Sequence, residues 1–160
     1  MRDESYKFLE ALMAAPSPSG FEEPAQMVVY DYLETWCDSV DSDVHGNVTG
    51  VLNAKAPMRV MLAGHVDQIG LMVKNVTKEG FLQFEAIGGI DPGVMPSQRV
   101  EIHAAKGVVR GVIGKMAIHL IEPEKRKVVE NADKLWIDIG AASKDAAEKL
   151  VSIGDPITFT

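Results

Sequence analysis

Apolar side chains recur at helical spacing through the first part of the chain. Positions three and four residues apart predict two amphipathic helices, over residues 4–14 and over about residues 22–36. The stretch "PSPSG" at residues 16–20 lies between them, and proline and glycine disfavour a continuing helix. Glu22 and Glu23 fall in the first turn of the second helix, where the helix dipole stabilises acidic side chains. The chain is therefore expected to open with two helices.

After the second helix the apolar pattern changes to short strand-like runs. Residues 39–44, "SVDSDV", and residues 47–54, "NVTGVLNA", predict two strands joined by a tight turn at His45 and Gly46. A further run from Pro57 to Ala63 is almost continuously apolar, which predicts a buried strand. Two helices, a hairpin and a buried strand favour an α/β region of about 65 residues.

The pattern changes again just after Asp67, where a second folding unit is expected to begin. Short strands recur at roughly ten-residue intervals, which is typical of a small antiparallel barrel or sandwich. They are predicted at residues 69–76, 80–87, 99–105, 107–114 and 135–139, and a short helix capped by Ser143 is predicted at residues 144–151. The last apolar residues, 157–159, are expected to form a strand that is left without a partner.

Composition narrows the class of protein further. Apolar residues make up 46% and charged residues 24%, as in ordinary soluble globular proteins. The net charge of -7 leaves no basic surface for nucleic acid. No run approaches the roughly 18 apolar residues of a membrane span, so no membrane partner is expected. The single cysteine, Cys37, cannot form an intramolecular disulfide, which favours a cytoplasmic location.

His65 and Asp67 are the strongest candidates for chemistry, because they follow the predicted buried strand. On an extended chain, residues i and i+2 point to the same side, and ligands bind at the carboxyl ends of strands in open α/β sheets. A neutral imidazole can bind a metal ion while a nearby carboxylate accepts its other N–H. The H-x-D spacing also suits a histidine that is merely hydrogen-bonded at a strand end, so both interpretations stay open.

The other histidines and two serines have simpler explanations. His45 lies in the predicted turn, His103 is expected to face solvent on a strand, and His119 follows an apolar run as an interface or capping residue. Ser17 and Ser19 lack the G-x-S-x-G surroundings of a nucleophilic serine. These residues carry no catalytic assignment.

Six motifs, taken in order, bear on the family. They are "PSPSGFEEP", "DVHGNVTGVL", "VMLAGHVDQIGLMV", "GGIDPGVMPSQRVEI", "GVIG" and "LWIDIGA". This ordered set resembles the start of the dinuclear-metal aminopeptidases that assemble as tetrahedral dodecamers, known as glutamyl or deblocking aminopeptidases and also as endoglucanase or cellulase M. The resemblance covers essentially the whole chain and a little under the first half of a family member.

The resemblance implies a fold class and a domain arrangement. It implies an α/β protein in which residues 1–68 form part of an incomplete zinc-peptidase-like α/β catalytic domain. Residues 69–153 would match an inserted PDZ-like β-barrel dimerisation domain, through which the protein would self-associate. Residues 154–160 would begin the return toward the catalytic domain.

The resemblance also implies a site. His65 would match the first metal-ligand histidine, and Asp67 the catalytic acidic residue that orients its imidazole. The intact enzyme would use two divalent metal ions, zinc or cobalt, to hydrolyse N-terminal residues from peptide substrates. The other ligands and the general base would lie beyond this chain, so the fragment is expected to bind metal weakly or not at all and to be inactive alone. Gln68 departs from the family pattern, because glutamate often follows the aspartate there.

Two alternatives from other classes remain at this stage. The chain could act as a non-catalytic assembly module that dimerises through the β-rich region. A glycoside hydrolase is disfavoured, because it needs two facing carboxylates and commonly aromatic platforms, whereas aromatic residues make up only 6% of the chain.

Overall fold

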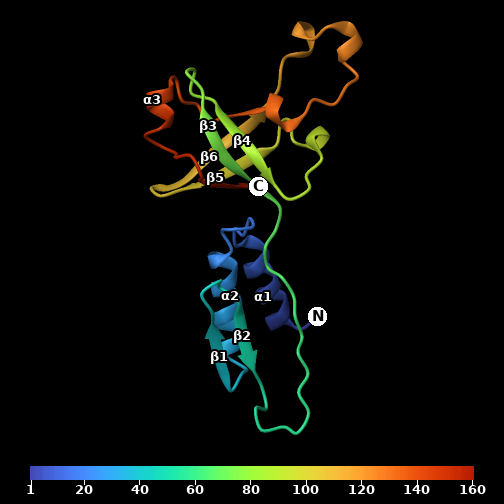
Figure 1. Cartoon of the computed structure of the whole chain (residues 1–160), viewed down its shortest axis with the longest axis vertical. Coiled ribbons are helices and arrows are strands. Elements are labelled where there is room, and N and C mark those ends of the chain that lie inside the picture. The colour runs from blue at the N-terminus through green and yellow to red at the C-terminus, as the bar shows by residue number, and fades with distance from the viewer. The chain divides into compact units, whose positions relative to one another are not determined.

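The structure is a computed structural model that describes residues 1–160 (Figure 1). It divides into two compact units, Met1–Gln68 and Ile69–Thr160, which we call the N-terminal unit and the barrel unit. None of the helices has the length and apolar character needed to span a bilayer. The overall class is mixed α/β, as predicted.

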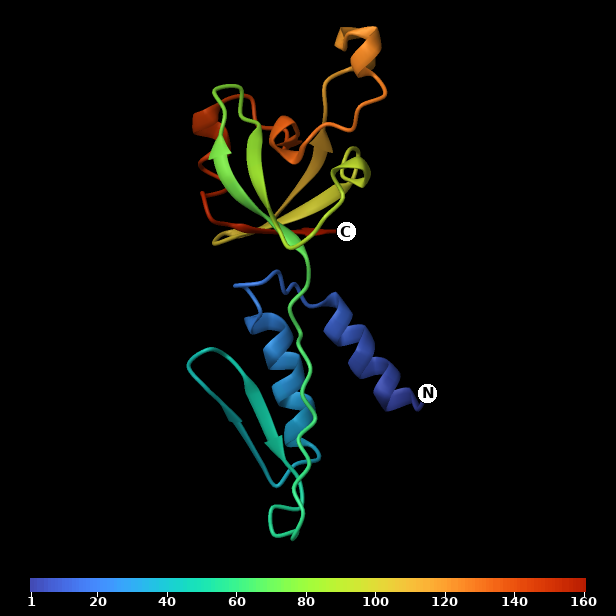
Figure 2. The same ribbon diagram turned by 45° about the vertical axis from the view of Figure 1, so that its right-hand side comes forward.

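Two helices form the centre of the N-terminal unit. Helix α1 spans Asp3–Ala14 and helix α2 spans Glu23–Glu34, which confirms the two predicted helices. They contact each other through Phe8 and Tyr32, whose stacked rings have centroids 4.1 Å apart. Figure 2 shows α2 between α1 and a β-hairpin, and α2 contacts α1 and both strands of the hairpin.

The hairpin consists of β1, Ser39–Ser42, and β2, Val48–Val51, paired antiparallel as predicted. The carboxylate of Asp43 organises its turn, because Oδ1 accepts from the backbone N–H groups of His45 at 2.9 Å and Asn47 at 3.0 Å. The hydrogen bond from the Asn47 side chain is the main reason why the pKa of Asp43 lies below its ordinary value. The turn is therefore held by an ionised carboxylate.

The predicted buried strand at residues 57–63 is wrong. These residues form no strand, and the side chains of Val60, Met61 and Leu62 are 73%, 87% and 94% exposed. The apolar pattern shows that a segment is suited to burial, but a strand also needs a neighbour with which to pair its backbone. The sheet of the N-terminal unit contains only β1 and β2, and neither pairs with this segment.

The barrel unit is a closed antiparallel barrel, which decides between the barrel and the sandwich that the sequence allowed. The strand order is β3-β4-β7-β6-β5-β8. The strands span Gly70–Val76 (β3), Leu82–Ile87 (β4), Arg99–Ala104 (β5), Gly107–Gly114 (β6), Trp136–Asp138 (β7) and Pro156–Phe159 (β8). Helix α3, Lys144–Ala147, is capped by Ser143, whose hydroxyl accepts from the Ala146 N–H at 3.3 Å. Each predicted strand of this unit is present within one or two residues.

Strand β8 completes the barrel by pairing with both β3 and β5. The expectation of an unpaired terminal strand is therefore wrong, since Ile157 lies opposite Leu71 on one side and Ile102 on the other. All three side chains are fully buried. Residues 154–160, which the resemblance assigned to a return toward the catalytic domain, contain this barrel strand.

The interior of the barrel holds one continuous apolar core. Alternate residues along the strands point inward, as a period of two requires. The core consists of Leu71, Val73, Val76, Leu82, Phe84, Met95, Val100, Ile102, Ile113, Leu135, Ile137, Ala147, Val151 and Ile157. Strand β6 approaches β7 so closely at Gly111 that a β-carbon there would lie 3.1 Å from the Asp138 carbonyl oxygen and would collide with Ile137.

Short 3-10 turns occupy the connections of the barrel. One follows β4 at Pro92–Val94, where Asp91 accepts from the Gly93 N–H at 2.8 Å. Three more lie in the long connection between β6 and β7, which Figures 1 and 2 show in orange extending from the barrel; they span Ile118–Leu120, Pro123–Lys125 and Ala132–Lys134.

Candidate functional site

Two segments far apart in sequence meet at the candidate site of the N-terminal unit. The backbone N–H of Gln68 donates to the carbonyl of Ser17 at 2.8 Å, and Pro18 forms a parallel bridge with Gln68. The hydroxyl of Ser17 also donates to the carbonyl of Val66 at 2.9 Å. Ser17 and Pro18 are buried, although most of this unit is not. The loop after α1 therefore holds the segment that carries His65 and Asp67.

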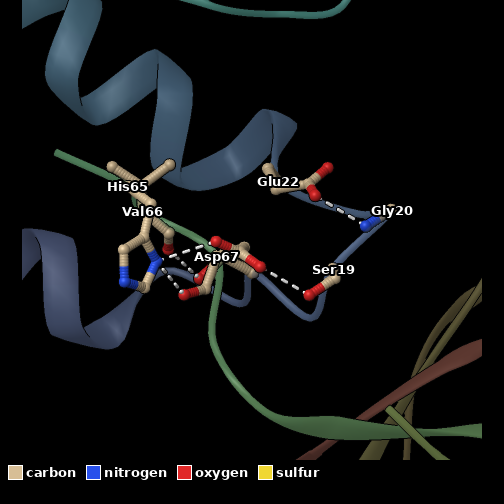
Figure 3. Close-up of polar contacts among 7 residues, drawn as sticks. Ser19, Gly20, Glu22, His65, Val66 and Asp67 are labelled. Atoms are coloured by element: carbon tan, nitrogen blue, oxygen red, sulfur yellow. Dashed lines mark hydrogen bonds and ion pairs between the residues drawn. The ribbon is translucent and has the colours of Figure 1, made fainter. Parts of the chain in front are cut away.

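The two candidate residues contact each other directly (Figure 3). His65 Nδ1 lies 2.8 Å from Asp67 Oδ1 and 3.1 Å from the Asp67 backbone carbonyl. The other carboxylate oxygen, Oδ2, accepts from the hydroxyl of Ser19 at 2.5 Å. The i, i+2 spacing thus brings the imidazole and the carboxylate together, and a serine from the first loop joins them.

The electrostatics of Asp67 decide which ring nitrogen carries the hydrogen. The hydrogen bond from Ser19 and then that from His65 hold the pKa of Asp67 below its ordinary value, against a smaller opposing effect of desolvation. The group is therefore ionised near neutral pH, and an ionised carboxylate only accepts hydrogen bonds. Nδ1 of a neutral His65 must then carry the hydrogen, and Nε2 carries the lone pair.

The lone pair on Nε2 is available to a ligand. Figure 3 shows this nitrogen on the side of the ring away from Asp67, and both hydrogen bonds of the ring are made by Nδ1. The His65 side chain is 85% exposed. A neutral imidazole whose other N–H is held by a carboxylate is a common arrangement for metal-ligating histidines.

A tight turn places Ser19 beside Asp67. The N–H of Phe21 donates to the carbonyl of Pro18 at 2.7 Å, and Gly20 between them has φ +93°. A positive φ at the third position is typical of a type II turn, and glycine adopts it without steric cost. The Gly20 N–H then donates to Glu22 Oε1 at 2.6 Å, which joins the turn to the start of α2.

The residues of this chain supply one position of a metal site and not a complete one. His65 Nε2 has the chemistry of a zinc or cobalt ligand, but no group of three or more histidine, cysteine or acidic side chains lies close enough together to hold a metal ion. Zinc sites in proteins use three or four protein ligands. The chain by itself therefore does not fit the two metal ions that the resemblance implies.

The remaining histidines lie on other elements of the chain. His45 lies in the hairpin turn and His119 in an exposed 3-10 turn. The expected solvent-facing position of His103 is wrong, because this side chain is half-buried and its Nε2 lies 2.8 Å from Thr158 Oγ1. Burial lowers the pKa of His103, and Glu101 opposes that shift only in part.

Sequence reasoning missed the part that Ser17 and Ser19 play. They were weighed only as nucleophiles, whereas the structure uses both hydroxyls as donors to the segment 66–67. The turn signal in "PSPSG" was visible, but its contact is with residues 48 or 49 positions further along the chain. Local sequence patterns contain no signal for such a contact.

Solved structures with the same fold define the class of protein. A TET aminopeptidase from a marine sediment archaeon of the Thaumarchaeota matches 98% of this chain with a TM-score of 0.92 and 37% sequence identity, over 45% of its own length. The TET1 peptidase of Pyrococcus horikoshii matches 97% of the chain with a TM-score of 0.85 and 33% identity, over 46% of its own length. The chain therefore has the fold of the part of these aminopeptidases that it matches.

Sequence comparison then identifies the family. Residues 46–160 match the M42 glutamyl aminopeptidase family, and the chain belongs to this family. A lysyl aminopeptidase of Pyrococcus furiosus is 33% identical over 147 residues, which are 91% of this chain and 42% of that protein. The chain thus spans less than half the length of the relatives it matches, and it corresponds to part of an aminopeptidase.

Proposed function

We propose that this chain supplies the N-terminal part of a metal-dependent aminopeptidase that removes N-terminal residues from peptides. Residues 1–68 would belong to an incomplete zinc-peptidase-like α/β catalytic domain. One observation supports the proposal most strongly. In this chain, which belongs to the M42 family, the ionised Asp67 binds Nδ1 of His65 and leaves the lone pair of Nε2 exposed. The single cysteine, Cys37, suits the reducing cytoplasm in which we place the protein.

The two residues have separate roles in this proposal. His65 Nε2 would hold one of two divalent ions, zinc or cobalt, while Asp67 fixes the tautomer and the orientation of the ring. The chemistry that such ions would supply in the intact enzyme is activation of a water molecule and polarisation of the scissile carbonyl. The other ligands and the general base come from residues outside this chain. The 160-residue chain alone therefore binds these ions weakly and has no peptidase activity.

A chimera tests the proposal. In this chimera, the 160-residue chain replaces the corresponding N-terminal part of the Thaumarchaeota TET aminopeptidase. The match covers 98% of this chain. Hydrolysis of aminoacyl-p-nitroanilides is measured with zinc or cobalt. The assembled chimera should be active, and His65→Ala should lower kcat/KM by at least about a hundredfold because a metal ligand is lost. Asp67→Asn should lower it by about 10- to 100-fold.

Matched controls separate loss of the site from loss of the fold. His45→Ala removes an exposed imidazole from the same unit and should leave activity unchanged. Light scattering and circular dichroism establish that each chimera has assembled and folded. A correctly assembled chimera with no turnover, or one that keeps full activity after His65→Ala, would contradict the proposed function.

We also propose that the barrel unit mediates self-association, as a PDZ-like dimerisation domain built mainly from residues 69–153. The P. horikoshii TET1 peptidase, which shares this fold, can assemble into a tetrahedron or a large octahedral shell. On β6 the apolar side chains of Val108 and Val112 are 54% and 44% exposed, so the barrel has apolar surface that a second copy could cover.

Light scattering of the 160-residue chain tests this second proposal. A dimer should appear at high protein concentration, and a charge introduced by Val112→Glu should shift the equilibrium toward monomer. Val128→Glu, at an exposed position in the connection after β6, serves as the matched control. A strict monomer at high concentration would overturn the assembly role without affecting the test of catalysis.

A further inference from the structure

Ser19 forms the one side-chain hydrogen bond that reaches His65 and Asp67, the candidate dyad, from another part of the sequence. Its hydroxyl donates to Asp67 Oδ2 at 2.5 Å across a separation of 48 residues. Neither the H-x-D spacing nor the proposed metal role accounts for this contact. It therefore calls for an explanation of its own.

The two oxygens of the Asp67 carboxylate have different donors. Ser19 occupies Oδ2, while His65 Nδ1 lies 2.8 Å from Oδ1 (Figure 3). A carboxylate that is held at one oxygen loses its freedom to rotate, so the other oxygen stays directed at its partner. The contact with Ser19 thus determines where the acceptor for His65 lies.

The backbone around Ser19 is suited to hold that hydroxyl in place. The type II turn fixes residues 18–21, and the backbone bond between Ser17 and Gln68 joins the turn to the segment beyond Asp67. Ser17 is only 3% exposed. The donor and the acceptor therefore sit on two backbone segments that are already bonded to each other.

We propose that Ser19 is a positioning residue for His65: by binding Asp67 Oδ2 it directs Oδ1 at the Nδ1 hydrogen and keeps the Nε2 lone pair free for a ligand. Ser19 touches neither the imidazole nor any reacting group, so it acts through Asp67. The inference rests on the proposed function only for the identity of the ligand at Nε2. The tautomer of His65 is a property of the metal-free chain.

Nitrogen-15 NMR of the metal-free 160-residue chain tests this directly, at a pH of about 8.5 where histidine is neutral. The two ring nitrogens of His65 report the ratio of the Nδ1–H to the Nε2–H tautomer. The Nδ1–H form should dominate, and Ser19→Ala should lower the ratio by about three- to tenfold, which is the range expected for one weakened hydrogen bond. The Asp67 backbone carbonyl, 3.1 Å from Nδ1, remains as a second acceptor, so some preference should persist.

Two variants of the same shape separate hydrogen bonding from packing. Ser19→Thr keeps the hydroxyl and should keep the ratio, whereas Ser19→Val replaces it by a methyl group and should lower the ratio as Ser19→Ala does. Ser42→Ala, which removes a hydroxyl from the hairpin of the same unit, should leave His65 unchanged. The ring signals of His45 provide an internal reference for the fold of the unit.

A double-variant cycle establishes that Ser19 acts through Asp67. In an Asp67→Ala background, Ser19→Val should have no further effect on the ratio. The carboxylate through which Ser19 acts on His65 is then absent. Equal ratios in the Thr and Val variants, or a wild-type chain in which the Nε2–H form dominates, would overturn the proposal. Because neither metal nor activity enters this measurement, an inactive chimera leaves it standing, and an active chimera does not rescue it.

Discussion

The two units of this chain differ most in what they bury. The barrel unit encloses a continuous apolar core, with side chains such as Leu71, Ile102 and Ile137 fully out of contact with solvent. The N-terminal unit buries only Ser17, Pro18 and Ala25. The apolar side chains of its helices are mostly only half-buried, as Phe8 and Leu33 are, and those of residues 57–63 are exposed.

The two units are therefore held together by different kinds of interaction. Apolar burial is the main favourable contribution to folding, so the barrel unit has the means to be stable as it stands. The N-terminal unit instead holds its candidate site with polar contacts, such as those of Ser17 and Ser19, each of which contributes little net free energy. Its helices and its exposed apolar segment have the character of surfaces that further packing would stabilise.

The largest expected contrast comes from removing an apolar side chain in each unit. Ile137→Ala should lower the free energy of unfolding of the barrel by about 2–5 kcal/mol, because Ile137 is fully buried in the core. Leu62→Ala should change stability by less than about 0.5 kcal/mol, because that side chain is 94% exposed. Urea unfolding of both variants measures the difference. A comparable loss in Leu62→Ala would mean that residues 57–63 are buried in solution.

A smaller effect is expected where β6 approaches β7. Gly111→Ala should destabilise the barrel by about 1–3 kcal/mol, because the added β-carbon collides with the buried Ile137. Gly89→Ala is the matched control, since a β-carbon there meets nothing within 4 Å and its φ is not positive. Urea midpoints compare the two, and a Gly111→Ala variant as stable as its control would show that the strands can separate without cost.

Replacing Gly20, in the turn of the N-terminal unit, should affect only the structure around that turn. Gly20→Ala forces a β-carbon into the left-handed region at φ +93°, which costs about 1–2 kcal/mol. The turn should open more often, and exchange of the Gln68 amide hydrogen should quicken by roughly tenfold. Gly64→Ala, where nothing lies within 4 Å and no positive φ is required, should leave that rate unchanged. Unaltered exchange in Gly20→Ala would show that the turn does not hold the segment that carries His65 and Asp67.

The smallest expected effect is the contribution of His103 to the pH dependence of the stability of the barrel unit. Burial holds the pKa of His103 below its ordinary value, so the unfolded chain takes up a proton at a higher pH than the folded barrel does. Stability is then full above about pH 6.5 and falls as the pH is lowered through the interval down to the depressed pKa. His103→Gln should flatten that part of the curve, measured as urea midpoints between pH 8 and pH 5. The same decline in the variant would assign it to other groups.

Much of the fold could be predicted because its signals are local. The helical spacing of α1 and α2, the turn after β1, and the period of two in strands β3 to β6 all follow from residues close together in sequence. The pairing of His65 with Asp67 could be anticipated for the same reason, since two residues on an extended chain share a side. Each of these features depends on geometry within a few residues.

The predictions that are wrong all concern contacts between residues far apart in the sequence. The burial of residues 57–63 was inferred from apolar content, but it depends on a partner strand that the N-terminal unit does not contain. Strand β8 was expected to be unpaired, although it lies between β3 and β5. His103 was placed in solvent, and its contact with Thr158 spans 55 residues. Each outcome depends on which distant segments meet.

The sequence by itself determined the local elements, the turn at residues 16–20 and the relation of His65 to Asp67, because short-range geometry and periodicity specify them. Only the tertiary structure decided the closure of the barrel by β8, the exposure of residues 57–63 and the contact of Ser19 with Asp67. These features depend on bringing together residues that are tens of positions apart, and local propensity carries no information about that choice. For this chain, the identity of the dyad follows from its sequence and its positioning follows from its fold.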